Sequence, residues 1–242
     1  MTTTRGALDG LGAFAFYIEN TPIEFLTPGY SRNFLCGVDS LREMIRDEQG
    51  AYLGDKDPAG PCGAMLIPGI SIVEFNPVTE DEAIGLSLTV HYKDPGPAKP
   101  EEHLLFSEVS VEFLKGDGAY LIGPMDERAG LDEAVNLWRL PKFGIWRVRA
   151  YGDYDFSAGD YVRGDHPDRV YPQDYKESGR TPESLPCQIS LEFWPEKTLR
   201  DAVHKTFESG DELITTPCTD YMLSGTPEEI AQRYAVVPPP PF

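Results

Sequence analysis

Hydrophobic and polar residues alternate along four segments of the chain. The segments are residues 86–92, 105–114, 145–151 and 187–194. Successive side chains of a β-strand point to opposite faces, so alternation predicts strands with one apolar and one polar face. Two of the segments contain nearly the same five residues, Val-Ser-Val-Glu-Phe at 109–113 and Ile-Ser-Leu-Glu-Phe at 189–193. The pattern therefore predicts antiparallel sheets with one buried face.

Shorter apolar runs and turn residues predict the remaining elements. Further strands are expected at residues 12–18, 70–75 and 119–122, the last of them after the turn sequence Gly-Asp-Gly. Helices are expected at residues 39–50, 126–138 and 196–209 and from Thr226 onward, from apolar spacing and capping residues. Many short strands separated by Gly and Pro favour a mainly β fold. We expect an antiparallel β-sandwich or jelly-roll-like domain with a few peripheral helices.

Residues 1–237 are expected to form a single β-rich domain, followed by a proline-rich tail at residues 238–242. Consecutive prolines favour an extended polyproline conformation, so the tail is either frayed or a docking motif for an aromatic groove. The strand pairs within residues 84–122 and 143–195 resemble each other, as they would in an internal pseudo-repeat. The alternative is that half-buried strands built from the same few residue types look alike.

The charge balance of the chain is strongly acidic. There are 40 Asp and Glu residues against 21 Lys and Arg residues, a formal net charge of −19. Such a surface repels nucleic-acid phosphates and anionic membranes, so we expect neither nucleic acid nor membrane as a partner. The excess of acids either keeps the protein soluble or recognises a basic protein.

The cysteines and apolar runs indicate a cytoplasmic protein. The four cysteines are scattered and form no Cys-x-x-Cys pair, which is typical of buried thiols in a reducing compartment. The apolar run at residues 11–18 is short and is preceded by one Arg, unlike a signal peptide. No stretch approaches the roughly 18 apolar residues needed to span a bilayer.

An acidic, tyrosine-rich segment follows the strand at residues 145–151. Its carboxylates include Asp153, Asp155 and Asp160, which could gather around a hard cation such as Ca²⁺. The spacing matches no EF-hand loop, and no cofactor is predicted beyond this alternative. The tyrosines could form a stacking platform for a ligand or a partner; they are Tyr154, Tyr161, Tyr171 and Tyr175. The remaining interpretation is a solvated loop held by a few aromatic anchors.

The same segment contains the candidate catalytic residues. His166 lies beside Asp165 and Asp168, and a histidine flanked by acids is a plausible general base because its ordinary pKa is near neutrality. Arg147 and Arg149 share one strand face and could grip a carboxylate or phosphate. The simpler account of the two arginines is cross-strand ion pairing, for example with Glu192. No nucleophile elbow, zinc-binding helix or phosphate-binding loop occurs in the sequence.

Two of the strand sequences resemble a recurring pair in other proteins. They are Ile-Trp-Arg-Val-Arg-Ala-Tyr-Gly at residues 145–152 and Cys-Gln-Ile-Ser-Leu-Glu-Phe-Trp-Pro at residues 187–195. The pair resembles uncharacterised bacterial β-sandwich-type proteins, in which a Tyr-Arg-Val-Arg strand is followed by a strand ending in Trp-Pro. The resemblance implies a β fold and carries no activity.

Acidity, a β scaffold and the absence of a catalytic signature favour a non-catalytic binding protein. It would be an inhibitor or immunity-type protein, or a ligand-binding accessory protein, whose partner is a basic protein or a small molecule. The alternative is an enzyme acting on a small molecule, with its pocket in or at the mouth of the β-sandwich. A third interpretation is a structural or assembly component, which would form a homo-oligomer.

Overall fold

The structure is a computed structural model that describes part of the chain. The described residues are 1–10, 14–18, 64–69, 72–75, 77, 82–113, 119–123, 130–141, 144–154, 169–206 and 209–217. The helices expected at residues 39–50 and from Thr226, and the proline-rich tail, lie outside the described residues.

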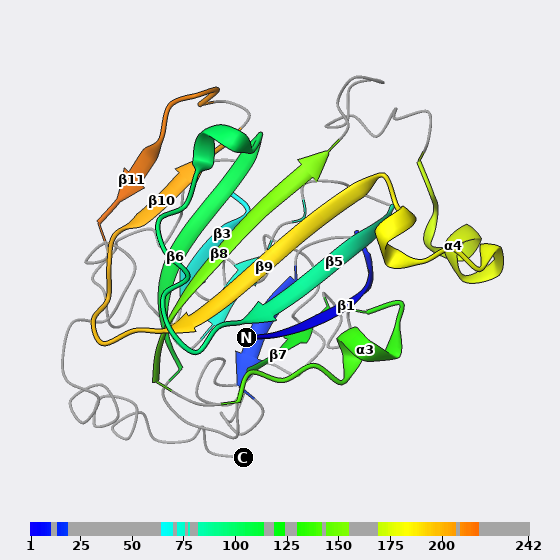
Figure 1. Cartoon of the computed structure of the whole chain (residues 1–242), viewed down its shortest axis with the longest axis horizontal. Coiled ribbons are helices and arrows are strands. Elements are labelled where there is room, and N and C mark those ends of the chain that lie inside the picture. The colour runs from blue at the N-terminus through cyan, green and yellow to red at the C-terminus, as the bar shows by residue number, and fades with distance from the viewer. Residues whose placement is uncertain are drawn as a thin grey trace, which may run out of the picture.

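The largest element of the fold is a seven-stranded sheet (Figure 1). Its strands, in spatial order, are β1 (Thr2–Asp9), β5 (Ala83–Val90), β9 (Cys187–Pro195), β8 (Gly144–Tyr154), β6 (Leu105–Phe113), β10 (Ala202–Lys205) and β11 (Ile214–Thr216). All neighbouring pairs in this sheet are antiparallel except β5 and β9, which run parallel. The antiparallel pairing predicted from the sequence is wrong for this pair, because alternation of apolar and polar residues identifies a strand but not the direction in which its neighbour runs.

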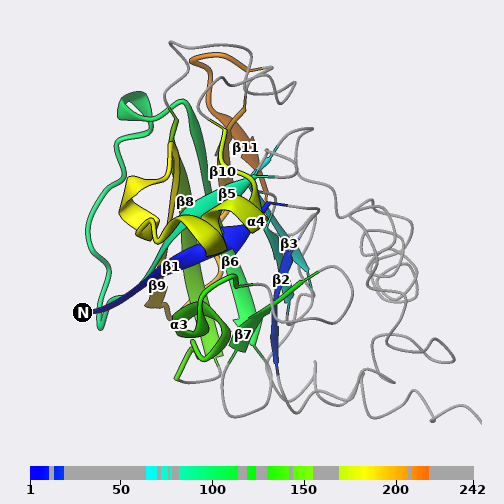
Figure 2. The ribbon, with the colours of Figure 1, turned by 90° about the vertical axis from the view of Figure 1, so that its right-hand side faces the viewer.

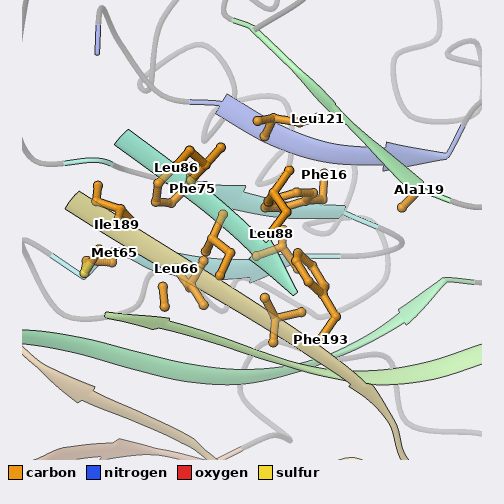
Figure 3. Close-up of a cluster of buried hydrophobic side chains, with 14 of the residues drawn as sticks. Phe16, Met65, Leu66, Phe75, Leu86, Leu88, Ala119, Leu121, Ile189 and Phe193 are labelled. Carbon is orange, nitrogen blue, oxygen red and sulfur yellow. The ribbon is translucent and has the colours of Figure 1, made fainter. Parts of the chain in front are cut away.

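A four-stranded antiparallel sheet lies along one side of the large sheet (Figure 2). Its strands, in spatial order, are β3 (Leu66–Gly69), β4 (Ile72–Phe75), β2 (Phe14–Ile18) and β7 (Ala119–Ile122). The two sheets share one apolar core, in which Phe16 of β2 meets Phe193 of β9 edge to face at 5.0 Å between ring centroids (Figure 3). The mainly β fold predicted from the sequence is confirmed.

Short helices flank the large sheet. They are α3 (Glu133–Asn136), α4 (Pro172–Ser178) and the 3-10 turns η2 (Pro100–Glu102) and η5 (Pro182–Ser184). The helix predicted at residues 196–209 is wrong, because Ala202–Lys205 form β10. Pairing with β6 and burial of Ala202 and His204 outweigh the apolar spacing that favoured a helix. No helix among the described residues is long and apolar enough to cross a membrane.

The four alternating segments are all strands, and they lie side by side in the large sheet in the order β5, β9, β8, β6. The apolar side chains of β6, such as Val109 and Val111, are fully buried in the core as the pattern predicted. The polar side chains on the opposite face are buried as well, for example Ser110 and Glu108. Residues 91–104, which connect β5 to β6, cross this second face (Figure 1) and contribute to covering it.

Candidate functional site

Arg147 and Arg149 bind the same carboxylate on the polar face of the large sheet. β8 pairs with β6 so that Arg149 lies opposite Glu108 and Arg147 lies opposite Ser110. The Nε of Arg147 donates to Glu108 Oε1 at 2.9 Å, and the Nε of Arg149 donates to Glu108 Oε2 at 2.7 Å. Each carboxylate oxygen of Glu108 therefore accepts a charge-assisted hydrogen bond from a different arginine.

Arg149 also joins the neighbouring strand β9 to the covering segment. Its Nη1 donates to Glu192 Oε2 at 3.1 Å, which is the cross-strand ion pair that the sequence predicted. Its Nη2 donates to the carbonyl oxygen of Gly96 at 2.9 Å, within residues 91–104. Its guanidinium carbon lies 4.7 Å from the ring centroid of the buried Trp194, a cation–π contact.

Arg147 holds the segment that leads from β9 to β10. Its Nη1 donates to Ser110 Oγ at 2.9 Å and to the carbonyl oxygen of Arg200 at 3.2 Å. Its Nη2 donates to the carbonyl oxygen of Asp201 at 2.9 Å. Every guanidinium nitrogen of Arg147 and Arg149 thus donates a hydrogen bond within the protein. Ligand binding by the two arginines stays a prediction, and it requires these hydrogen bonds to break.

The outer part of this network reaches solvent. His91 Nε2 lies 3.2 Å from Glu192 Oε1, and Ser110 Oγ donates to Glu196 Oε2 at 3.1 Å. Arg200, whose side chain is 44% exposed, pairs with Glu196. Through the arginine contacts with the carbonyl oxygens of Gly96, Arg200 and Asp201, the network fastens residues 91–104 and 196–201 over the sheet.

Two of the predicted tyrosines lie near α4 in different surroundings. Tyr171 is 49% exposed, and the guanidinium carbon of Arg169 lies 5.1 Å from its ring centroid. Tyr175 is buried, and its hydroxyl donates to Asp132 Oδ2 at 2.8 Å. Burial, reinforced by this hydrogen bond to Asp132, raises the pKa of Tyr175 to about 12. Tyr175 is therefore an aromatic anchor, while Tyr171 is available to a partner.

The other predicted site residues are not brought together by the described part of the structure. The backbones of Asp153 and Tyr154 end β8, and nothing is described of their side chains. The following residues lie outside the described ranges: Asp155, Asp160, Tyr161, Asp165, His166 and Asp168. Among the described residues, no group of three or more His, Cys, Asp or Glu side chains could hold a metal ion. The calcium site and the catalytic histidine stay predictions.

A buried serine–histidine pair was missed by the sequence analysis. Ser107 Oγ accepts a hydrogen bond from the backbone N–H of Met65 at 3.1 Å and lies 3.1 Å from His204 Nδ1. His204 is fully buried, and its Nε2 has no hydrogen-bond partner among the described residues. Burial, with a smaller contribution from Arg147, lowers the pKa of His204 to about 4. The neutral imidazole therefore fills a core position. The signal in the sequence was the spacing of Ala202 and His204 by two residues, which places both on one face of a strand.

Comparison with known proteins identifies no family. No protein-family model matches the sequence, and no curated protein matches it. A solved structure named "Crocagin biosynthetic gene J" is similar over 81% of this chain and 98% of that chain, with 14% sequence identity and a TM-score of 0.43. A likeness of this degree supports no statement about function.

Proposed function

We propose that this chain is a non-catalytic binding protein, of the inhibitor or accessory type, whose acidic surface docks a basic partner protein. The observation that carries the proposal is where the charges lie. The buried charged side chains of the described residues are Glu82, Glu108, Arg147, Arg149 and Lys205, three bases and two acids. Within the described residues the interior therefore takes up none of the acidic excess, which lies on side chains that are exposed or partly exposed.

A rigid frame is a second support for this proposal. We interpret the two sheets and their shared core as a β-sandwich, and we propose that the protein is cytoplasmic. The arginine network holds the connecting segments against the large sheet. A surface held in one conformation loses little conformational entropy when it binds, so more of the contact energy appears as affinity. Acidic groups on such a surface attract a basic partner at long range and increase the rate of association.

The enzyme alternative has less support from the described residues. Its candidate base His166 and the neighbouring Asp165 and Asp168 lie outside them. The described serine–histidine pair is fully buried, since Ser107 and His204 are both 0% exposed. A substrate would have to open the core to reach it.

The proposal is tested by affinity capture with the full chain from a lysate of the source organism, at about 50 mM and about 500 mM NaCl. A structurally unrelated acidic protein of matched size and net charge serves as the control for simple ion exchange. We expect at least one basic protein to be retained by this chain and not by the control, and to be released at the higher salt concentration. Retention of the same basic proteins by both baits, or of none, would contradict the proposal.

A further inference from the structure

Two exposed leucines lie at one end of the large sheet, next to the β10–β11 edge. Leu104 directly precedes β6 and is 47% exposed, and Leu213 directly precedes β11 and is 49% exposed. In the paired strands Lys205 lies opposite Phe106 of β6, and His204 lies opposite Ile214 of β11. Extended by one residue, this register places Leu213 opposite Lys205, so that Lys205 lies between Leu213 and Phe106. Leu104 precedes Phe106 by two residues and therefore lies on the same face of the sheet. Two exposed leucines on the same face and at the same end of a sheet are apolar surface that a partner can cover.

Lys205 fastens the two segments that carry these leucines. Its ammonium group donates to the carbonyl oxygen of His103 at 2.8 Å and lies 3.5 Å from that of Pro100. The same group lies 3.2 Å from Asp211 Oδ1, in the turn that leads to β11. Figure 1 shows the end of the β5–β6 connection and the β10–β11 turn together at this end of the sheet. The buried lysine thus joins residues 100–104 and 209–213 into one surface.

The rim of this surface is acidic. Its exposed carboxylates are Glu101, Glu102, Asp211 and Glu212. Lys99 is paired with Glu102 and Lys205 with Asp211, so Glu101 and Glu212 leave the rim with a net negative charge. Two leucines framed by carboxylates complement a segment that presents both apolar and basic side chains.

Another corner of the sheet has exposed apolar residues but lacks this charge pattern. Met1 is 70% exposed and Tyr92 is 78% exposed, and β1 and β5 bring them close because Thr2 pairs with Val90. The exposed residues that follow Tyr92 are Lys93 and Asp94, which carry opposite charges, so this corner has no acidic rim. A basic partner is therefore better accommodated at the leucine surface.

We infer that the surface formed by Leu104, Leu213 and the surrounding carboxylates is the docking site for a basic amphipathic segment of the partner protein. The inference rests on the proposed function and adds where the partner binds and what chemistry it presents. Leucines at the centre exclude water and supply affinity, and the acidic rim selects Lys and Arg.

The test uses the full chain and two synthetic peptides of equal length and charge, one made of Lys and Leu in helical periodicity and one of Lys and Ser. Binding is measured by isothermal titration calorimetry at about 50 mM NaCl, and contacts are mapped by amide chemical-shift changes. We expect the Lys/Leu peptide to bind more tightly and to shift resonances of residues 100–105 and 209–214.

Matched variants distinguish binding at the leucine surface from general attraction of a basic peptide to an acidic protein. The double variant Leu104→Ser/Leu213→Ser should weaken Lys/Leu peptide binding by about tenfold or more. The control variant Leu137→Ser changes a leucine that is 56% exposed at the end of α3, which packs against β1 at the other edge of the sheet, and should bind as the wild type does. Thermal unfolding curves check that each variant remains folded.

The acidic rim is tested in the same way. The triple variant Glu101→Gln/Glu102→Gln/Asp211→Asn should weaken binding and reduce its salt dependence. The pair Asp174→Asn/Glu177→Gln on the exposed face of α4 should have a smaller effect. Peptide binding that maps elsewhere, or that is unchanged in the leucine variant, overturns this inference and leaves the proposed function standing. Failure of both peptides to bind the wild type counts against both proposals.

Discussion

Glu108 is the carboxylate that pairs with both buried arginines of the large sheet. It accepts hydrogen bonds from both Arg147 and Arg149, whose side chains are 3% and 9% exposed. We expect Glu108→Gln to destabilise the protein by about 3 to 5 kcal/mol, because the buried Arg147 then loses its ion pair with Glu108 and Arg149 retains only the one with Glu192. Chemical denaturation monitored by circular dichroism measures this difference in the free energy of unfolding.

The control for Glu108 is a glutamate on the surface. Glu102 pairs with Lys99, and both side chains are more than half exposed. Glu102→Gln should leave the unfolding midpoint unchanged, because surface ion pairs contribute little. Equal unfolding midpoints for Glu108→Gln and the wild type would show that the charge network is not needed for stability.

His204 makes stability depend on pH. Its folded-state pKa of about 4 lies below the ordinary value of 6.5, so between these values the unfolded chain binds more protons than the folded one. The contribution of neutral His204 is fully present above pH 6.5 and is lost progressively as the pH falls towards 4. The loss amounts to about 3 kcal/mol at the lower end of this window.

The measurement compares the wild type with His204→Asn in denaturant titrations from about pH 7.5 to about pH 4.5. Other titrating groups are common to both proteins, so the difference between the two curves isolates His204. We expect the variant to be less stable at the higher pH and to lose less stability on acidification. Parallel curves would mean that His204 does not titrate in this window.

At the scale of elements, α3 packs against β1 so closely that two positions beside Val135 have room only for glycine. A Cβ at Gly6 would lie 2.4 Å from Val135 Cγ2, and a Cβ at Gly130 would lie 2.6 Å from Val135 Cβ. Gly6→Ala and Gly130→Ala should each destabilise the protein by about 1 to 3 kcal/mol through overpacking. Val135→Ala removes the atom that clashes at Gly6 but retains the Cβ that clashes at Gly130.

A double-mutant cycle distinguishes the two glycines. Combining Val135→Ala with Gly6→Ala should recover most of the cost of the Gly6 substitution, with a coupling energy of about 1 kcal/mol or more. The same combination with Gly130→Ala should recover little. Similar coupling at both positions would contradict the packing of α3 on β1.

The elements predicted well from the sequence are those whose two faces differ chemically. β9 carries apolar side chains at every second position and β6 does so except at Ser107, and that periodicity is independent of the neighbouring strand. β1 was missed because Thr2–Asp9 combines a threonine run with a glycine and shows no alternation. The parallel pairing of β5 with β9 depends on the path of the chain, which strand periodicity does not encode.

The candidate site was predicted only in part, for a similar reason. The sequence predicts that Arg147 and Arg149 share a face and that Glu192 can pair across the strands, since both follow from register. It does not predict that residues 91–104 and 196–201 close over that face, because their backbone carbonyls carry no sequence signal. Glu108 was therefore expected to face solvent, whereas the structure buries it.

At the scale of the whole molecule, the net charge opposes folding. A formal charge of −19 on 242 residues repels itself more strongly in the compact state than in the expanded unfolded chain. Salt screens this repulsion, with a Debye length that falls from about 30 Å at 0.01 M to about 8 Å at 0.15 M. We therefore expect NaCl to raise the thermal midpoint over this range, by about 2 to 4 °C for each kcal/mol of repulsion removed.

Exposed ion pairs such as Arg5–Glu183 and Arg200–Asp94 weaken with the same salt, but each of them contributes little. Repeating the experiment with choline chloride separates general screening from a specific effect of sodium, because the two salts have the same ionic strength. Equal increases with both salts indicate screening of the acidic surface. A thermal midpoint that falls with salt would show that ion pairs outweigh the self-repulsion. The acidic side chains would then be neutralised by basic side chains of the same protein, and they would be a weaker basis for recognising a basic partner.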